Sequence, residues 1–551
     1  MKLNLIDRAI AQIDPQRALQ RVAARANLDL FQGLPTGGAS AQADSGYTST
    51  AGTDSFLGRW FARPRSAAAD TLRQLPNQRG QSRDLVRNNP IAASAINTNV
   101  VRAIGTGLAY SPQPHLATLG WSPEQGAEWS AEVSAEFSLF ADSTECDWYG
   151  EQNFYGLQDL VTRSQLESGD CFTVLPDGTI TATMPYALRL QVLEADRVGN
   201  PGNKPDSAEF AAGVRRAAGG GMPTGYHVYT RHPGAGWLNG ASGDLWAGEW
   251  VIPTGRSGRR RMLHHFKRLR PEQPRGIPYL APVMGLFKLL GTYTDAEVKA
   301  AVISAYLTLV IETPTGAGLP NIFGLGQPTG AATPNSGGQS QAPTADIEMG
   351  PGHVVSLASG EKANVVNPGR PNPAFGDFVQ SVMNQLGAGT FIGREMLMKE
   401  FNTSYVAARA AFLDAWKHLL DVRTGTARSF CQPVSETWMA EAVARGRIRA
   451  PGFFTDARLR WAYTRAAWQG DSQGSINPKD EVAAYRDAID ARLCTQERAE
   501  WELFGSNWNE TYPTKLAEQK RMAKDQILPV PRAGGAAGAQ QPAAAPGEVP
   551  A

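Results

Sequence analysis

One short segment of the chain could carry nucleophilic catalysis. Gly470, Ser472 and Gly474 fit the pattern G-x-S-x-G in GDSQG. In serine hydrolases this pattern forms a sharp turn between a strand and a helix, which exposes the serine oxygen. Here the preceding RLRWAYTRAAWQ is compatible with a helix, and Pro478 lies where the following helix would begin. We therefore favour a loop, and keep a serine hydrolase using Ser472 as the alternative.

Other enzyme chemistry finds little support. His264 and His265 are adjacent in an alternating run without an acidic neighbour at metal-ligand spacing, so we interpret them as structural strand histidines. No H-E-x-x-H motif occurs, and no lysine follows a glycine, so the phosphate-binding loop of many ATPases is absent. The sequence predicts a protein that is not an enzyme, with no catalytic, cofactor-binding or metal-binding residues and no cofactor.

The strongest charge feature is residues 254–275, which hold eight Lys or Arg residues and one acidic residue, Glu272. Such a patch could contact phosphates, and DNA binding would then depend steeply on salt. Phe266 is the one interleaved aromatic, so base stacking is not indicated. We favour contacts between subunits for seven of these residues: Arg256, Arg259, Arg260, Arg261, Lys267, Arg268 and Arg270.

Composition limits the classes of protein that remain. The 551 residues carry 53 basic and 52 acidic side chains, so no global charge draws the chain onto nucleic acid. Four separated cysteines indicate a reducing compartment. The longest apolar run, 300–311, is short of the roughly 20 residues of a membrane helix, and no signal peptide is visible. We expect a soluble protein made inside the cell.

The elements alternate between helical and extended patterns. Asp177-Gly178 predicts a hairpin turn, and Thr294 to Glu297 predicts a capping box that opens a second helical half. The tryptophans at 416, 438, 461 and 468 fall in helical patterns and indicate core packing. Expected helices are 1–30, 83–103 (stopped by Gly105 and Gly107), 125–139, 155–168, 278–311, 373–387, 404–421 and much of the chain beyond 481; expected strands lie within 171–198 and 224–232; expected irregular segments are 33–56, 312–353 and 529–551.

Several phrases, in order over about 400 residues, resemble the portal proteins of tailed bacteriophages, lambda-like branch. The most specific is the R-P-x-Q-x-R-G-I-P phrase from Arg270 to Pro278. The others are RDLVRNNPIAASAINTNVVRAIGTGL (83–108), QLESGDCF (165–172), LEADRV (193–198), GYHVY (225–229), YTDAEVKAAVISA (293–305), MGPGHVVSLASGEKANVVNPGRPNPAFGDF (349–378), SYVAARAAFLDAWK (404–417) and INPKDEVAAYRDAI (476–489). Val406 after Tyr405, and Asn477 before Pro478, depart from the residues expected there.

The resemblance implies an α+β portal fold with a mixed α/β wing, a helical stem, a small α/β clip and a helical crown. The implied boundaries are an arm at 1–82, wing at 83–277, stem at 278–310, Gly/Pro-rich clip at 311–370, stem at 371–388, tunnel loop at 389–403, wing completion and crown at 404–526, and a disordered tail at 527–551.

The resemblance also implies the function and its partners. Such subunits form a ring, expected here to be a dodecamer, at one capsid vertex, and double-stranded DNA passes through it during packaging and ejection. Implied partners are the terminase large subunit, head–tail adaptor proteins, and the major capsid and scaffold proteins, with no membrane. The expected location is the virion, and the host cytoplasm during assembly. Arg394, Lys399 and Asn402 are the expected polar groups near the DNA path. Two rivals remain: a hydrolase or maturation protease using Ser472, and a monomeric DNA-binding capsid protein.

Overall fold

The structure is a computed structural model, and it describes residues 65–524 except 208, 218–220, 236–245, 307–309, 313–361, 365–374, 401–403, 474–477 and 506–507. The chain divides into two compact units, Met1–Asp70 and Thr71–Ala551. Helix α3 (Ala67–Thr71) spans the division, and the later elements belong to the second unit. The predicted helix at 1–30, the arm at 33–56, Asn402, the tail and most of 311–370 lie outside the described residues.

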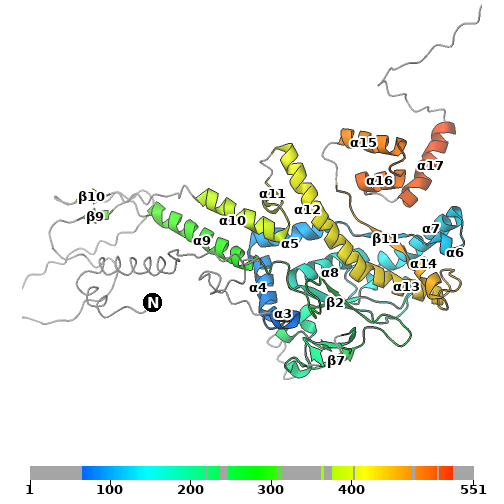
Figure 1. The fold of residues 1–551 in the computed structure, drawn as a ribbon, viewed down its shortest axis with the longest axis horizontal. Coiled ribbons are helices and arrows are strands. Elements are labelled where there is room, and N and C mark those ends of the chain that lie inside the picture. Colours follow the sequence, from blue (N-terminus) through cyan, green and yellow to red (C-terminus); the bar gives the residue numbers. More distant parts are fainter. Residues whose placement is uncertain are drawn as a thin grey trace, which may run out of the picture. The chain divides into compact units, whose positions relative to one another are not determined.

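The first core is built on helices that carry apolar residues every three or four positions. Helices α7 (Pro123–Ala141) and α8 (Phe154–Ser168) match the predicted helices, and each is capped by a side chain, Ser122 and Asn153 respectively. Helix α13 (Gln432–Ala444) packs with them, and its Trp438 is fully buried beside Phe137. Strand β1 (Ala109–Pro112) pairs antiparallel with β11 (Ala466–Gln469) at the same core. Figure 1 shows these elements.

Two small antiparallel sheets follow α8. Strand β2 (Asp170–Val174) is central between β3 (Gln191–Glu194) and β8 (Met262–Phe266). A four-stranded sheet runs in sequence order: β4 (Phe210–Ala211), β5 (Val214–Arg216), β6 (Pro223–Tyr229) and β7 (Gly248–Val251). The histidine pair lies in β8, as predicted. The architecture is α+β, which confirms the predicted fold class.

The predicted hairpin at Asp177-Gly178 is wrong. Strand β2 ends at Val174, and its partner β3 begins only at Gln191, so a long loop joins them. Within that loop Gly178 donates its N–H to the carbonyl of Ala187, 2.7 Å away. A two-residue hairpin turn needs positive φ at its central positions, and Gly178 is not among the glycines with positive φ.

The predicted helix at 83–103 is two helices. Helix α4 (Leu75–Asn88) ends where α5 (Pro90–Ala103) begins, with Asn89 between them. The Asn89 side-chain oxygen accepts the N–H groups of Ile91 and Ala92 at 3.0 and 3.1 Å. Pro90 has no N–H to continue α4 and suits the first turn of a new helix. Gly105 and Gly107 then leave the helical region with positive φ, as predicted.

The helical region predicted from 278 begins six residues later, as α9 (Met284–Tyr306). The capping box at Thr294 is wrong, because α9 is continuous through it. The Thr294 hydroxyl instead donates to the Leu290 carbonyl one turn earlier, at 2.9 Å, a bond that serine and threonine make inside helices. Strands β9 (Val310–Glu312) and β10 (Lys362–Asn364) pair antiparallel further along the chain.

The remaining elements are mainly helical. Helix α10 (Phe375–Thr390) and the short α11 (Arg394–Met398) lead to α12 (Tyr405–Thr426). A π-helical turn at Ala427–Cys431 joins α12 to α13. Helix α14 (Ala457–Thr464) precedes β11, and α15 (Pro478–Asp490), α16 (Gln496–Phe504) and α17 (Trp508–Lys524) follow.

Two of the four tryptophans differ from expectation. Trp438 is buried, and Trp416 packs on a second core, as predicted. The buried residues of this second core include Ile96, Phe287, Leu386 and Leu419. Trp468 lies in strand β11 and not in a helix, although it still packs on the first core. Trp461 is 49% exposed, so the core-packing interpretation is wrong for that residue.

Candidate functional site

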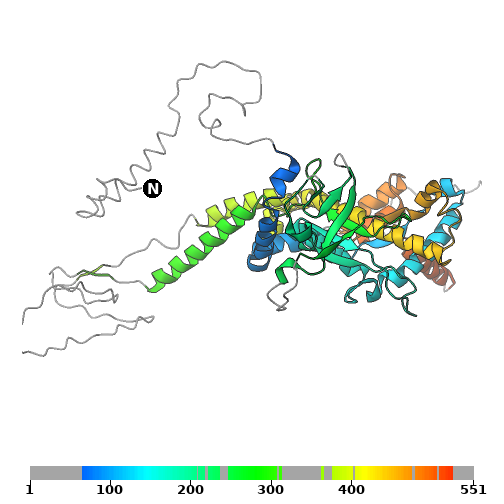
Figure 2. The same cartoon turned by 90° about the horizontal axis from the view of Figure 1, so that it is seen from below.

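Helices α9 and α10 lie side by side in both views (Figures 1 and 2). The start of α9 and the end of α10 pack in the second core through buried side chains that include Phe287, Leu290 and Leu386. Further out, the Tyr293 ring contacts the rings of Phe378 and Phe375, with centroids 4.8 and 5.7 Å apart. This pairing fixes one face of α9 against α10.

The other faces of α9 differ in chemistry. Leu289, Val298 and Val302 are 56, 57 and 50% exposed. At about 100° per residue, the two valines lie on roughly the opposite flank of the helix from Leu289. The charged side chains on the face between these flanks are Lys288, Asp295 and Lys299. Helix α9 therefore buries one face and carries charge on the outer face, with exposed apolar groups on both flanks.

A strained corner joins α10 to α11. Phe391 has φ +54°, which a non-glycine residue rarely adopts, and its side chain is 66% exposed. Its ring stacks on His418 at 5.3 Å, and His418 stacks on Tyr279 at 5.9 Å. Burial lowers the pKa of His418, and the nearby Lys267 lowers it further. This aromatic column holds the corner against α12.

The three residues predicted near a DNA path belong to or follow this corner. Arg394 begins α11 and is half-buried, whereas Lys399 ends it with φ +56° and is exposed. Asn402 lies outside the described residues. Arg394 and Lys399 thus lie at the two ends of α11, the first inside the helix and the second just after it.

A buried ionic centre lies where helix α4, strand β2, strand β8 and the 270–276 segment meet. Asp170 has no exposed surface and is 2.5 Å from Arg275 Nε and 2.7 Å from Arg79 Nη2. His264 Nε2 is 3.1 Å from Asp170, and the Gly276 N–H donates to the same carboxylate at 3.2 Å. Arg275 also donates to the carbonyls of Val198, Ala212 and Ala195. We call Asp170, Arg79, Arg275 and His264 the ionic centre.

Two glycines permit this approach. A Cβ on Gly276 would lie 1.9 Å from the Gly169 carbonyl oxygen, and Gly169 itself has φ +90°. Only glycine at both positions lets the start of β2 and the 276 segment pass this closely. The glycines therefore place Asp170 beside Arg275, the arginine of the phrase that carried most of the family resemblance.

In the ionic centre, Asp170 is ionised at neutral pH, whereas His264 is neutral. Burial alone raises the pKa of Asp170, but the guanidinium groups of Arg275 and Arg79 outweigh it and hold that pKa well below its usual range. Burial lowers the pKa of His264 to about 4, although its bond to Asp170 opposes this. The carboxylate is thus ionised and fully bonded at neutral pH. Such a group stabilises a fold and is not available for proton transfer.

The sequence analysis did not single out Asp170 or Arg79. Arg79 and Asp170 are 91 positions apart, and Asp170 and Arg275 are 105 apart, so no local spacing reveals the cluster. The available signals were the motifs ESGD around Asp170 and RGI around Arg275, which appeared only as family phrases, and Arg79 lies in none of these phrases.

The residues predicted as subunit contacts are dispersed. Three pair with acids of their own chain: Arg259 with Asp177 at 2.6 Å, Arg260 with Glu436 at 3.2 Å, and Lys267 with Asp421 at 2.5 Å. The Arg268 guanidinium lies 5.9 Å from the ring of Phe266. Arg256, Arg261 and Arg270 are exposed.

Ser472 is held in a structural contact. It follows strand β11, and its hydroxyl donates to the backbone carbonyl of Leu503 at 3.3 Å. The adjacent Asp471 accepts from the N–H and hydroxyl of Thr106 at 3.3 and 3.2 Å, and its carbonyl accepts from Arg423. The segment therefore ties the end of α5 to α12 and α16.

Glu194, Asp196 and His232 form a cluster of residue types that bind metal ions, but their neighbours do not favour a cation. His232 Nε2 lies 3.0 Å from Glu194 and 3.7 Å from Asp196. Asp196 already pairs with Arg79 and Arg83, whose charges oppose a cation. His232 Nδ1 accepts the Gly234 N–H at 3.0 Å, so Nε2 carries the proton in the neutral ring. His232 Nε2 lacks hydrogen-bond geometry to either acid, and the two arginines beside Asp196 make the cluster unfavourable for a metal ion.

Within the described residues, every helix is too short or too polar to cross a membrane. The described residues combine a mixed α/β body, two paired helices with exposed apolar side chains, and an ionic centre whose groups pair with one another. Residues 53–423 match the family model "Phage portal protein, lambda family", and the chain belongs to that family. It is therefore a portal subunit of the capsid vertex, and a component of the virion. The family is structural, and the hydrolase alternative is unsupported.

Two relatives extend the match over most of the chain. Portal protein B of Escherichia phage lambda is 25% identical over 470 residues, covering 83% of this chain and 86% of that protein. The portal protein of Escherichia phage N15 is 26% identical over 475 residues, with the same coverage of each. Among solved structures, a chain from the neck of a native gene transfer agent particle, computed with C12 symmetry, is 12% identical with TM-score 0.41, covering 76% of this chain and 92% of that chain.

Proposed function

We propose that this portal subunit assembles head to tail into a closed ring, expected to be a dodecamer, whose channel conducts double-stranded DNA during packaging and ejection. Family membership supports the proposal. In the same proposal the terminase large subunit and head–tail adaptors dock on the ring, and the major capsid and scaffold proteins surround it. Assembly takes place in the host cytoplasm.

The observation that carries the ring is the distribution of side chains on α9. Leu289 on one flank, and Val298 and Val302 on the other, are exposed apolar groups that a lone subunit leaves in water. A contact that uses two different faces of each subunit is heterologous, and such contacts close into a ring when the rotation permits. Burial of each valine would contribute up to about 1.5–3 kcal/mol per interface.

In this proposal α9 and α10 are the stem, and the α10–α11 corner approaches DNA. Exposed Lys399 and half-buried Arg394 are then the polar groups near the duplex, together with Asn402. The basic segment contributes subunit contacts. Exposed Arg256, Arg261 and Arg268 are better placed for such contacts than Arg259, Arg260 and Lys267, which have acidic partners within the chain.

The ring is tested by electron microscopy and native mass spectrometry of the purified full chain. We expect rings with a channel wide enough for a duplex. Val298→Asp combined with Val302→Asp should yield monomers, because it places charge in each interface. The matched control Lys299→Asp changes charge on the outer face and should leave the rings intact. Monomers of the unchanged chain at every salt concentration, with or without scaffold protein, would contradict the proposal.

A further inference from the structure

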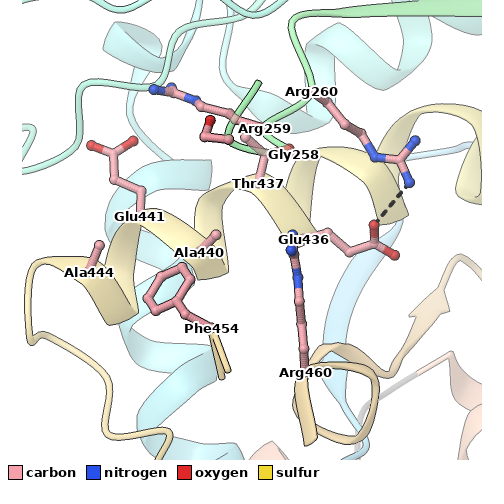
Figure 3. Close-up of a pocket in the computed structure, with 11 residues that line it drawn as sticks. Gly258, Arg259, Arg260, Glu436, Thr437, Ala440, Glu441, Ala444, Phe454 and Arg460 are labelled. Atoms are coloured by element: carbon pink, nitrogen blue, oxygen red, sulfur yellow. Dashed lines mark hydrogen bonds and ion pairs between the residues drawn. The ribbon is translucent and has the colours of Figure 1, made fainter. Parts of the chain in front are cut away.

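A groove of about 270 Å³ lies between the turn before β8 and helix α13 (Figure 3). Gly255 and Arg261 donate backbone N–H bonds to Arg259 and Pro253 and close that turn. Ala440 and Ala444 of α13 contribute small apolar side chains, and the opposite rim carries Phe454 and Arg460. A cavity of this size can hold one or two apolar side chains.

The carboxylates that line the groove are already engaged. Glu441 accepts the N–H groups of Ala187 and Leu188 at 2.5 and 3.0 Å, and it pairs with Arg445 at 2.7 Å. Glu436 pairs with Arg260 at 3.2 Å and accepts from Gln432. A new cation would therefore find no carboxylate to bind.

Arg460, on the opposite rim, has a different environment from that of the two glutamates. The Arg460 guanidinium lies 5.5 Å from the Phe453 ring and makes no ion pair with a described carboxylate. Arg259, Arg260 and Arg460 outnumber the two lining glutamates, so the charge surplus of the groove is positive. A carboxylate approaching Arg460 would complete an ion pair that no carboxylate among the described residues makes.

Phe454 is an exposed aromatic residue of the rim, and a second exposed aromatic residue, Trp461, follows Arg460 in the sequence. Phe454 is 61% exposed, and Trp461 of α14 is 49% exposed under the guanidinium of Arg465, 5.2 Å from its ring. Arginine and aromatic residues are the types enriched at the centres of protein interfaces. An aromatic residue exposed on a rim, above a floor of alanines, indicates a protein partner in preference to a phosphate backbone.

We propose that this groove, with Phe454 and Arg460 on its rim, docks an acidic segment of another protein of the particle. An apolar side chain of that segment enters between Phe454 and the alanines of α13. An Asp or Glu beside it pairs with Arg460. The proposal concerns a surface remote in sequence from α9 and does not depend on ring formation.

The probe is a blocked, dye-labelled peptide of repeating Leu-Glu-Glu, compared with Leu-Gln-Gln by fluorescence anisotropy on the full chain. We expect the acidic peptide to bind at least tenfold more tightly than its neutral counterpart. Arg460→Gln should weaken binding about tenfold, and Phe454→Ser about fivefold, while Arg460→Lys retains more of it. Arg486→Gln is the matched control, since Arg486 is an exposed arginine of α15.

Two results would overturn the proposal. One is equal binding of the peptide by the unchanged chain, Arg460→Gln and Phe454→Ser. The other is a blunt DNA duplex that binds the groove more tightly than the peptide and loses affinity with Arg460→Gln, which would make the groove a phosphate site. Thermal melting of each variant checks that the fold is intact.

Discussion

At the scale of single residues, the ionic centre is a place where one substitution should be costly. Asp170 joins two arginines from segments on either side of it in sequence, all of them buried. Removing one partner of a buried ion pair leaves an uncompensated charge, which costs more than the pair itself contributes. The stability of the region around strand β2 therefore depends on the Asp170 carboxylate.

Asp170→Asn should lower the free energy of unfolding by about 3–5 kcal/mol, because Arg79 and Arg275 remain charged and buried. Urea denaturation followed by circular dichroism measures this. Asp159→Asn, at a partly exposed pair with Arg163, is the control and should change stability by less than about 1 kcal/mol. An equally small effect at Asp170 would show that water or other groups compensate the two arginines.

The histidines of β8 predict how stability depends on pH. Burial lowers the pKa of His264 to about 4 and that of His265 to about 3, against an ordinary value of 6.5. As the pH falls below 6.5, these histidines bind protons in the unfolded chain but not in the folded chain. The free energy of unfolding therefore decreases from pH 6.5 towards pH 4. The depressed pKa of Asp170 adds a further loss at still lower pH, below its unfolded value.

His264→Gln separates these contributions. The glutamine amide can still donate to Asp170 but does not titrate, so the decrease in unfolding free energy between pH 6.5 and 4 should become shallower. The measurement is urea denaturation at several pH values. An unchanged slope would mean that folding does not lower the pKa of His264.

At the scale of elements, side-chain caps explain why most helices were predictable. Ser122, Asn153 and Ser404 each accept a backbone N–H at the start of a helix, and each lies just before an apolar-periodic segment. Two of the errors had a common origin. Asp177-Gly178 and Thr294 carry residue types that fit a turn and a cap, but they lie in a long loop and in a helix interior.

Asn89 gives a prediction for the junction of α4 and α5. Asn89→Ala removes the acceptor for two N–H groups, and we expect the free energy of unfolding to fall by about 1 kcal/mol. Asn89→Ser keeps an acceptor and should recover most of that loss. Thermal or urea denaturation of both variants checks it. Equal losses for the two substitutions would show that the cap is not the source of the stability.

At the scale of the whole molecule, the paired helices and the ionic centre could be predicted to different extents. The apolar pattern indicated both helices of the pair, because local periodicity specifies them. The ionic centre depends on contacts across about a hundred residues, which one sequence does not reveal. The same limit applies to the groove beside α13, whose rim combines residues near 260, 440 and 460.

The balanced charge of the chain predicts how strongly it binds DNA. With 53 basic and 52 acidic residues, a subunit offers few uncompensated cations, and several arginines of the basic segment pair internally. Each phosphate neutralised adds about 0.9 to the slope of log affinity against log salt. A channel that lets DNA slide requires few such contacts.

We therefore expect weak binding of a duplex by the full chain at about 0.15 M salt, where the screening length is about 8 Å. The salt slope should be shallow, corresponding to fewer than about three phosphates per subunit. Fluorescence anisotropy across a salt series measures both quantities. Lys399→Gln should reduce the slope further, whereas Lys267→Gln, which also removes an exposed lysine, should not, because Lys267 is paired with Asp421. A steep slope from a monomeric chain would instead favour the DNA-binding rival, because a protein that grips many phosphates resists the sliding that a channel needs.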